Sequence, residues 1–166
     1  MPGPGREGRP MRSNLSPAVE GGLEARVAAL FRSQGLAVLA TQGEGQPYAN
    51  LVACAATPGL CGVLFATNRD TRKFQNLAGE PRVSLLIDNR ANHKADFQAA
   101  MAATAVGTAV EVTGADLASL RGTYLAKHPD LEDFLVAPAC ALIRVQVETY
   151  YVVQRFQDVQ AFQPGK

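Results

Sequence analysis

Apolar residues recur along this chain with two different periods, and each period predicts a different kind of element. Near the beginning they recur at intervals of three and four positions, as they do on the buried face of an amphipathic helix. The residues with this spacing are Leu23, Val27, Leu30 and Phe31. We therefore predict a helix over this stretch, and Gly35 ends it.

From Leu36 onward, short apolar stretches are separated by turn residues, which is the pattern of consecutive strands. The predicted strands cover residues 36–41, 47–56, 60–67, 82–88, 104–113 and 141–148, residues 150–155 continue the last strand or pair with it, and 156–162 form a short terminal piece. Gly107 lies inside the fifth strand, where the lack of a side chain permits close approach of another backbone.

Two further helices interrupt this series of strands. The first follows the third strand; Asp70 can cap its start and Gly79 ends it. The second is opened by Thr113 and Asp116, which have the spacing of a capping box, and it stops before Pro129. Six or so strands with hairpin spacing and three helices predict a mainly β (α+β) fold, an antiparallel barrel with helices packed outside.

Length and charge exclude several classes of protein. With 166 residues the chain has the length of one domain. Its 16 basic and 15 acidic residues are spread along the sequence, so no basic stripe indicates nucleic acid as a partner. The apolar runs are far shorter than the ~20 residues that span a bilayer, so we expect no membrane partner either.

The first 22 residues differ in composition from the rest. They are rich in Pro, Gly, Arg and Ser and contain no apolar segment like that of a secretory signal. We expect a flexible tail over residues 1–22 and one domain over residues 23–166. Met11 is an alternative to Met1 as the natural start.

Three cysteines, an odd number, argue against a disulfide framework. A two-residue loop between the second and third strands would place Cys54 opposite Val63, with Cys61 diagonal to it and too far away for an easy bridge. We expect Cys54, Cys61 and Cys140 to be buried free thiols in a reducing cytoplasm. We expect no metal site, because no Cys-x-x-Cys pair occurs and the two histidines are far apart in the sequence.

Segment 66–73, which joins the third strand to the second helix, combines hydroxyl and basic side chains. The start of a helix leaves backbone N–H groups without partners and carries a partial positive charge, so it suits an anion. Thr67 and Thr71 add hydroxyls, and Arg72 and Lys73 add positive charge. This combination predicts a phosphate-binding corner. The alternative is that both cations are simply solvated in the first turn of a surface helix.

The corner and the sequences around it resemble a known family. The similar segments are Gly45-Gln46-Pro47-Tyr48, the run from Val63 to Asn68, Thr71-Arg72-Lys73, and the run from Glu80 to Leu86. Over roughly residues 36–112, the chain resembles the pyridoxamine 5′-phosphate oxidase-related, FMN-binding split-barrel proteins. The resemblance implies a six-stranded antiparallel split β-barrel with peripheral helices, in agreement with the pattern above, and FMN as the cofactor.

The resemblance also implies which residues bind FMN. It assigns the FMN phosphate to Thr67, Thr71, Arg72 and Lys73, with Asn68 in the same corner, and the isoalloxazine ring to the backbone of the strand that contains Asn50, Leu51 and Val52. It further implies a homodimer with each FMN at the subunit interface.

The chain departs from the pyridoxamine phosphate oxidases proper at the substrate site. Those enzymes carry a basic residue at the place of Asn50, a lysine at Ala55, a glutamine near Ala102 and an arginine at His128. Their C-terminal Arg-x-His motif is missing from residues 150–166. We therefore expect an FMN-dependent oxidoreductase for another small molecule, and not a true pyridoxamine phosphate oxidase.

Two alternatives stay open: a haem-binding or haem-degrading protein, and a flavin carrier or sensor without turnover. If no flavin binds, a plain interaction barrel is a further possibility. A haem iron would need a histidine ligand such as His93 or His128. The pattern instead favours His93 as a solvated loop residue and His128 as a residue at the C-terminus of a helix. We expect Tyr150 and Tyr151 to pack the strand or a dimer contact, and the sequence identifies no catalytic side chain.

Overall fold

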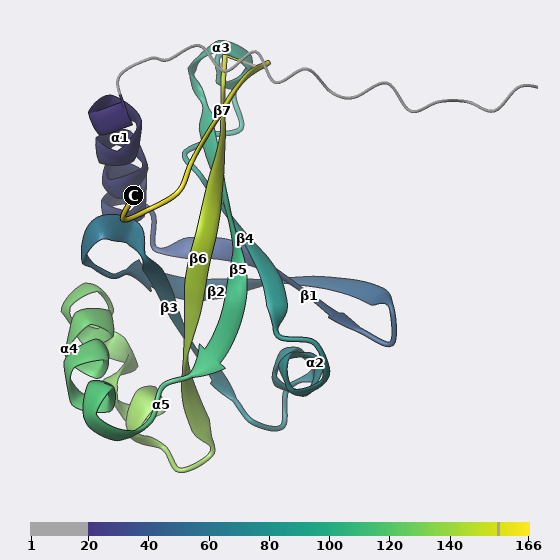
Figure 1. Ribbon diagram of the computed structural model, residues 1–166, viewed down its shortest axis with the longest axis vertical. Coiled ribbons are helices and arrows are strands. Elements are labelled where there is room, and N and C mark those ends of the chain that lie inside the picture. Colours follow the sequence, from purple (N-terminus) through teal and green to yellow (C-terminus); the bar gives the residue numbers. More distant parts are fainter. Residues whose placement is uncertain (1–19, 156) are drawn as a thin grey trace, which may run out of the picture.

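A computed structural model describes residues 20–155 and 157–166 of the chain. All strand pairings in this part are antiparallel, in the order β3-β2-β1-β4-β5-β6-β7, and pairing of β3 with β6 closes the first six into a barrel (Figure 1). The strands are β1 (Leu36–Gly43), β2 (Gln46–Ala56), β3 (Gly62–Asn68), β4 (Arg82–Asp88), β5 (Met101–Glu111), β6 (Cys140–Gln154) and β7 (Asp158–Phe162). The predicted six-stranded antiparallel split barrel with peripheral helices is confirmed, and β7 is an additional strand.

Helices cover the outside of the barrel (Figure 1). They are α1 (Glu20–Ser33), α2 (Arg72–Gly79), α3 (Asp96–Ala99), α4 (Leu117–Lys127) and α5 (Glu132–Val136). Helix α1 begins before Leu23, so the last residues of the predicted tail 1–22 are helical. The rest of that tail, and Phe156 of the predicted terminal piece, lie outside the described residues.

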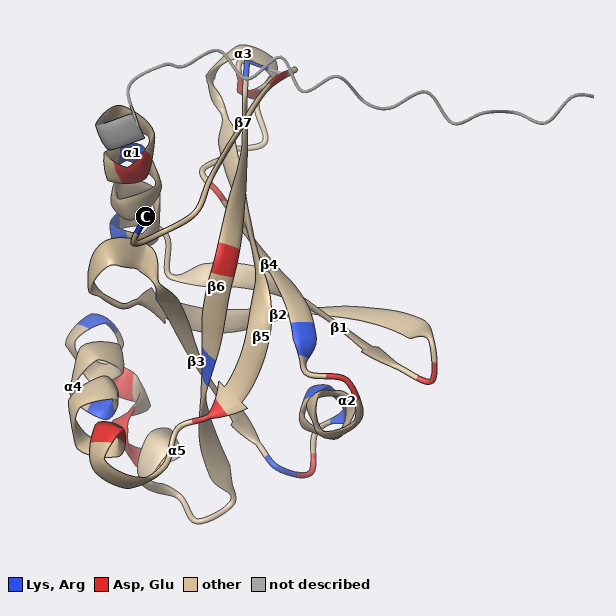
Figure 2. Ribbon diagram, in the orientation of Figure 1, with Lys and Arg blue, Asp and Glu red and all other residues tan. Residues whose placement is uncertain are grey.

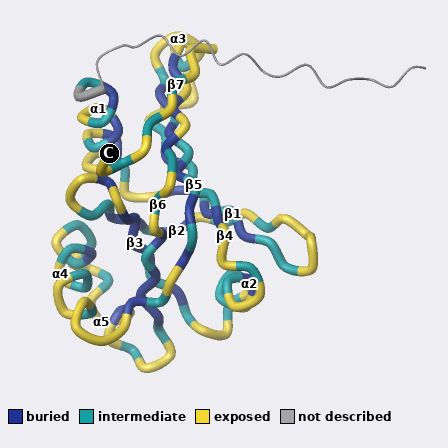
Figure 3. Tube along the Cα trace, viewed as in Figure 1, coloured by how far each residue is buried: buried dark blue, intermediate teal, exposed yellow. Residues whose placement is uncertain are grey.

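Buried residues recur along the strands of the barrel (Figure 3), and the core that they form has two parts. The larger fills the barrel and the space under α1, and Val27, Leu39 and Leu85 in it are fully buried. The smaller lies between the barrel wall and helices α4 and α5, around Leu64 and Tyr124. Burying each such side chain stabilises the fold by roughly 1.5–3 kcal/mol. Along β2, Val52 and Cys54 belong to the larger part, and the alternate residues Ala53 and Ala55 belong to the smaller part, next to the helices.

The connection between β2 and β3 differs from the predicted two-residue turn. Cys54 pairs with Phe65, not with Val63, because a short 3-10 turn over Pro58–Leu60 lengthens the loop. Cys61 follows this turn and is exposed, whereas Cys54 is buried and Cys140 half-buried. The prediction of three buried thiols is therefore wrong for Cys61, although none of the three forms a disulfide.

The predicted helix caps are wrong in both places. Thr71, and not Asp70, caps α2, because its extended backbone lets its hydroxyl accept a hydrogen bond from the Phe74 N–H (3.4 Å). The backbone of residues 114–116 forms a 3-10 turn ahead of α4, and the Thr113 hydroxyl caps nothing there.

A buried hydroxyl fixes the loop between β2 and β3. Leu60 has a φ of 59°, which is sparsely populated for a residue with a side chain. The Tyr150 hydroxyl donates a hydrogen bond of 2.8 Å to the Leu60 carbonyl, and both residues are buried.

Replacing Tyr150 by phenylalanine should lower the free energy of unfolding by about 1–3 kcal/mol, because the Leu60 carbonyl would lose its buried donor. Denaturant unfolding measures the change. Tyr151→Phe is the matched control, since Tyr151 is exposed, and it should unfold like the wild type. Equal stability of both variants would show that the hydroxyl does not hold the loop.

Candidate flavin groove

A groove of about 300 Å³ lies between the barrel wall and helices α4 and α5. It is lined by Leu51, Val52, Ala53, Ala66, Thr67, Asn68, Thr71, Lys73, Tyr124, Leu131 and Phe134. The strands β2 and β3 form one wall, the start of α2 forms one end, and α4 and α5 supply the other wall. Six of the eight residues predicted to bind the cofactor thus line one groove: Leu51, Val52, Thr67, Asn68, Thr71 and Lys73.

Two hydroxyls meet at the α2 end of the groove. The Thr67 and Thr71 hydroxyl oxygens are 2.9 Å apart, close enough for a hydrogen bond in either direction. Both hydroxyls also lie within hydrogen-bond distance of the Asn68 carbonyl, at 3.3 Å and 2.8 Å. The Thr71 hydroxyl also accepts the Phe74 N–H, so this pair of hydroxyls lies at the start of α2. The arrangement brings two hydroxyls and a helix N-terminus together, and a bound anion would take the place of the Asn68 carbonyl as the acceptor of the hydroxyl protons.

Lys73 brings a positive charge to this end of the groove. Its side chain is partly buried, and that burial lowers the pKa of the ammonium below its usual value. Within the described residues it makes no ion pair, whereas Arg69, on the same turn, makes a two-pronged pair with Glu111 at 2.8 and 2.5 Å. Figure 2 shows the mixed charges on this turn. An anion in the groove would therefore meet one uncompensated cation.

The other two predicted residues lie outside the groove. Arg72 is exposed and lies 5.1 Å over the ring of Tyr48, beside a separate polar hollow next to the β1–β2 turn. Asn50 pairs with Leu39 of β1, and Leu39 is buried in the barrel interior, so Asn50 lies on the interior face of β2. The side-chain amide of Asn50 donates to the Leu51 carbonyl at 3.2 Å.

The helical wall of the groove was not predicted as part of the site. Tyr124 is buried, which raises its pKa to about 12, and its hydroxyl donates to the Ala53 carbonyl at 3.4 Å. Leu131 and Phe134 complete this wall. In the sequence, Tyr124 belongs to an apolar helical face, and that pattern alone cannot distinguish packing on the barrel from lining a groove.

Neither histidine contributes to the groove. His93 is exposed in the loop before α3, and the His128 Nε2 lies 2.9 Å from the Cys54 carbonyl. Because a carbonyl only accepts, Nε2 carries the proton in this contact. Over residues 20–155 and 157–166, no cluster of His, Cys, Asp and Glu side chains could hold a metal ion.

None of the helices in the same part of the chain is long and apolar enough to cross a membrane.

The open side of the groove continues into an apolar strip on the outer face of the sheet. Directly paired residues of antiparallel strands share a face. By this rule one row crosses six strands, and it consists of Leu51, Val38, Leu86, Thr104, Tyr151 and Ala161. Leu51 is 63% exposed and Tyr151 is 47% exposed. We call these six residues the outer row.

Solved structures share this fold. A heme binding protein from Mycobacterium smegmatis superposes with a TM-score of 0.74 at 23% identity, over 84% of this chain and 56% of that protein. Campylobacter jejuni ChuZ gives a TM-score of 0.74 at 12% identity, over 87% of this chain and 61% of that one. A FAD-binding protein from Mesorhizobium loti gives a TM-score of 0.61 at 18% identity, over 77% and 91% of the two chains. This chain therefore spans little more than half the length of the Mycobacterium protein.

At these sequence identities the structural matches show only that the proteins share a fold. No curated protein sequence matches the chain. The sequence model of the pyridoxamine 5′-phosphate oxidase family matches residues 23–154, which is most of the chain and includes every strand of the closed barrel. The chain therefore belongs to the pyridoxamine 5′-phosphate oxidase-related family.

Proposed function

We propose that the groove binds FMN and that the protein is an FMN-dependent oxidoreductase. The observation that supports this most is the partly buried ammonium of Lys73, without an ion pair among the described residues, next to the paired hydroxyls of Thr67 and Thr71. A phosphate would accept hydrogen bonds from these three side chains and from the start of α2. The apolar walls around Leu51 and Phe134 would contact the ring system.

The proposal specifies FMN over FAD. The corner offers one cation and two hydroxyls, which suits a single terminal phosphate. In a Rossmann fold, the pyrophosphate of a dinucleotide is bound by a Gly-x-Gly-x-x-Gly loop that directly follows a strand. No strand of this chain is followed by that sequence, which occurs only at residues 3–8, ahead of the first predicted helix.

Once bound, the isoalloxazine ring supplies the redox chemistry, and the chain supplies position and electrostatics. The β2 backbone at residues 50–52 would lie along the ring, and its N–H groups could stabilise the negative charge that builds on reduction. Helices α4 and α5 would shield one side of the ring from water. No acid or base from a side chain is part of this proposal.

The open side of the groove is the basis for proposing a homodimer. The outer row begins at Leu51, which lines the groove, and extends across the sheet to Tyr151 and Ala161. Exposed apolar surface that is continuous with a binding groove is typical of an interface. A second copy on the outer row would cover the groove and enclose the flavin between subunits.

Tyr151→Lys should convert the dimer to a monomer and weaken FMN binding, because a charged side chain would have to be buried in the interface. Light scattering after size-exclusion chromatography gives the mass, and flavin absorbance of the same peak gives the occupancy. Val110→Lys is the matched control: Val110 is 41% exposed but lies outside the outer row, so this variant should stay dimeric. A dimeric Tyr151→Lys protein with full flavin would contradict the proposed interface.

The substrate is proposed to be a small molecule other than pyridoxamine or pyridoxine 5′-phosphate. Ala55, at the place of the substrate-phosphate lysine, is buried and has no charge. His128, at the place of an arginine, is committed to the Cys54 carbonyl. An unpaired phosphate in a partly closed site is strongly disfavoured.

We therefore expect negligible formation of pyridoxal 5′-phosphate from either vitamin phosphate under air, even with FMN fully bound. The assay follows the product at saturating substrate, with an authentic oxidase as the positive control. Turnover within about tenfold of that enzyme, a difference of only ~1.4 kcal/mol, would show that another residue binds the substrate phosphate.

The absorbance spectrum of the purified protein tests flavin against the second candidate cofactor, haem. The heme binding protein from Mycobacterium smegmatis, which shares the fold, is the reason to consider haem. Flavin bands support the proposal, a Soret band would replace it with haem binding, and flavin without turnover on any reductant would indicate a carrier or sensor. We propose a cytoplasmic location, which the three free cysteines support because a reducing compartment keeps thiols free.

A further inference from the structure

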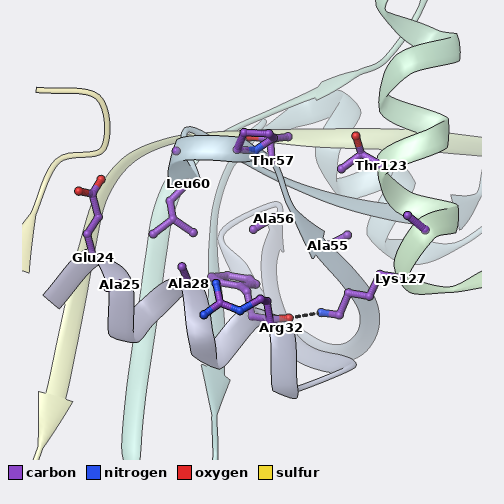
Figure 4. A pocket seen from close by; sticks show the side chains of 14 residues that line it. Glu24, Ala25, Ala28, Arg32, Ala55, Ala56, Thr57, Leu60, Thr123 and Lys127 are labelled. Carbon is purple, nitrogen blue, oxygen red and sulfur yellow. Dashed lines mark hydrogen bonds between the residues drawn. The ribbon is translucent and has the colours of Figure 1, made fainter. Parts of the chain in front are cut away.

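A second hollow is separate from the flavin groove. It has a volume of about 780 Å³ and lies between α1, the loop after β2, and α4 (Figure 4). It is lined by Glu24, Ala25, Ala28, Phe31, Arg32, Ala55, Ala56, Thr57, Pro58, Gly59, Leu60, Thr123, Ala126 and Lys127. Small-molecule sites are typically ~300–1,000 Å³ and mostly apolar. None of its lining residues lines the groove.

Small side chains create this space. Alanines from three elements face it: Ala25 and Ala28 from α1, Ala55 and Ala56 from β2, and Ala126 from α4. Their methyl groups leave a gap between the two helices that longer side chains would fill. Phe31 and Leu60 supply larger apolar surface. The wall at Leu60 is held by the hydrogen bond from the Tyr150 hydroxyl to the Leu60 carbonyl.

One end of the cavity is positively charged. The Lys127 ammonium donates to the carbonyls of Phe31, Gln34 and Cys54 at 2.5, 2.6 and 2.8 Å. Three acceptors need three N–H groups, so Lys127 is held as the cation. Arg32 directly follows Phe31 and also lines the cavity, and Figure 4 shows its side chain between Lys127 and Glu24. No acidic side chain forms an ion pair with either cation within residues 20–155 and 157–166.

The other end of the cavity is acidic. Glu24 lies two turns of α1 away from Arg32, and Figure 4 shows it at the opposite side of the hollow from Lys127. The cavity therefore has an apolar body, the Lys127 cation at one end, and a carboxylate at the opposite side that repels a second negative group. The Arg32 guanidinium, without an ion pair among the described residues, lies between them.

We propose that this cavity is a second ligand site, which binds an apolar monocarboxylate. The carboxylate would pair with Arg32, with Lys127 as a fixed second positive charge. The apolar part would lie on the alanines, Phe31 and Leu60. Glu24, at the opposite side from Lys127, would repel a second negative group there and so disfavours dicarboxylates. This site does not depend on the flavin, because the two hollows have no lining residue in common.

Calorimetric titration with dodecanoate, below its micelle concentration, tests the proposal. Arg32→Glu should weaken binding about tenfold or more, because it replaces the partner of the carboxylate with a like charge. Arg26→Glu is the matched control, since Arg26 is an exposed arginine of the same helix outside the cavity, and it should bind like the wild type. Dodecylammonium, with the same chain and the opposite charge, should bind more weakly than dodecanoate.

A second variant, Ala28→Leu, tests the location by filling the cavity while leaving both cations in place, and it should also lose dodecanoate. If Ala28→Leu does not fold, the two arginine variants decide the question. No binding to the wild type, equal losses in Arg32→Glu and Arg26→Glu, or release of flavin by dodecanoate would overturn the proposal. Flavin absorbance that is unchanged in Arg32→Glu separates this result from the proposal for the groove.

Discussion

Gly107→Ala is expected to destabilise the protein by about 3–5 kcal/mol, a large part of the 5–15 kcal/mol that typically separates a folded domain from its unfolded chain. A Cβ atom at this position would lie 2.0 Å from the Gln146 carbonyl oxygen and 2.9 Å from its carbon. Both are backbone atoms of β6, so no side chain can rotate away. The register of β5 and β6 also shifts between Val106 and Gly107, so the contact lies beside an irregularity of the ladder.

Thermal and denaturant unfolding measure this effect, and a collapse in soluble yield would agree with it. Gly122→Ala is the matched control, because Gly122 lies within α4 and a Cβ there has open space. Alanine favours a helix, so this variant should be more stable than the wild type by roughly 0.5–1 kcal/mol. A Gly107→Ala protein that melts with the wild type would mean that β5 and β6 can separate without loss.

Lys73→Met is expected to weaken FMN binding by about 1.5–3 kcal/mol, which is roughly ten- to 150-fold. The substitution keeps the length of the side chain and removes the one unpaired cation of the groove. Lys94→Met makes the same change at an exposed position and should leave the affinity unchanged. Arg72→Met should have a smaller effect than Lys73→Met, because Arg72 lies over Tyr48 and outside the groove.

The pH dependence of FMN binding gives an independent test of Lys73. Burial already lowers its pKa in the free protein, and a bound phosphate would raise it. The contribution of Lys73 should then be complete below the pKa of the free protein and be lost as the pH rises through the higher pKa of the complex. The Lys73→Met protein should lack this loss. Identical alkaline profiles for both proteins would contradict a contact between Lys73 and the phosphate.

Local sequence signals were sufficient for most of the fold. The spacing of Leu23, Val27 and Phe31 and the alternation along β6 report periodic burial directly, and the structure confirms both elements. Gly107 was expected to allow close approach, and the β6 backbone is indeed at that distance. The cap of α2 could not be assigned because Asp70 and Thr71 are both good caps, and the path of the chain out of β3 favours Thr71.

The parts of the site that sequence could not predict depend on long-range packing. The position of Arg72, at the start of α2, follows from its contact with Tyr48, which lies on β2. The lining of the groove by Tyr124 and Phe134 depends on how α4 and α5 lie on the barrel. The loop at Leu60 is set by a hydrogen bond to Tyr150, which is 90 positions away. Such contacts leave no mark in the local pattern of apolar residues.

The central claim is that the corner of Thr67, Thr71 and Lys73 binds a single terminal phosphate. Titration of cofactor-free protein with FMN and with riboflavin, which lacks only the phosphate, tests this claim most directly. We expect FMN to bind about a hundredfold more tightly, since two charge-assisted hydrogen bonds of ~1.5 kcal/mol each would supply that ratio. Equal affinities for the two flavins would contradict the account.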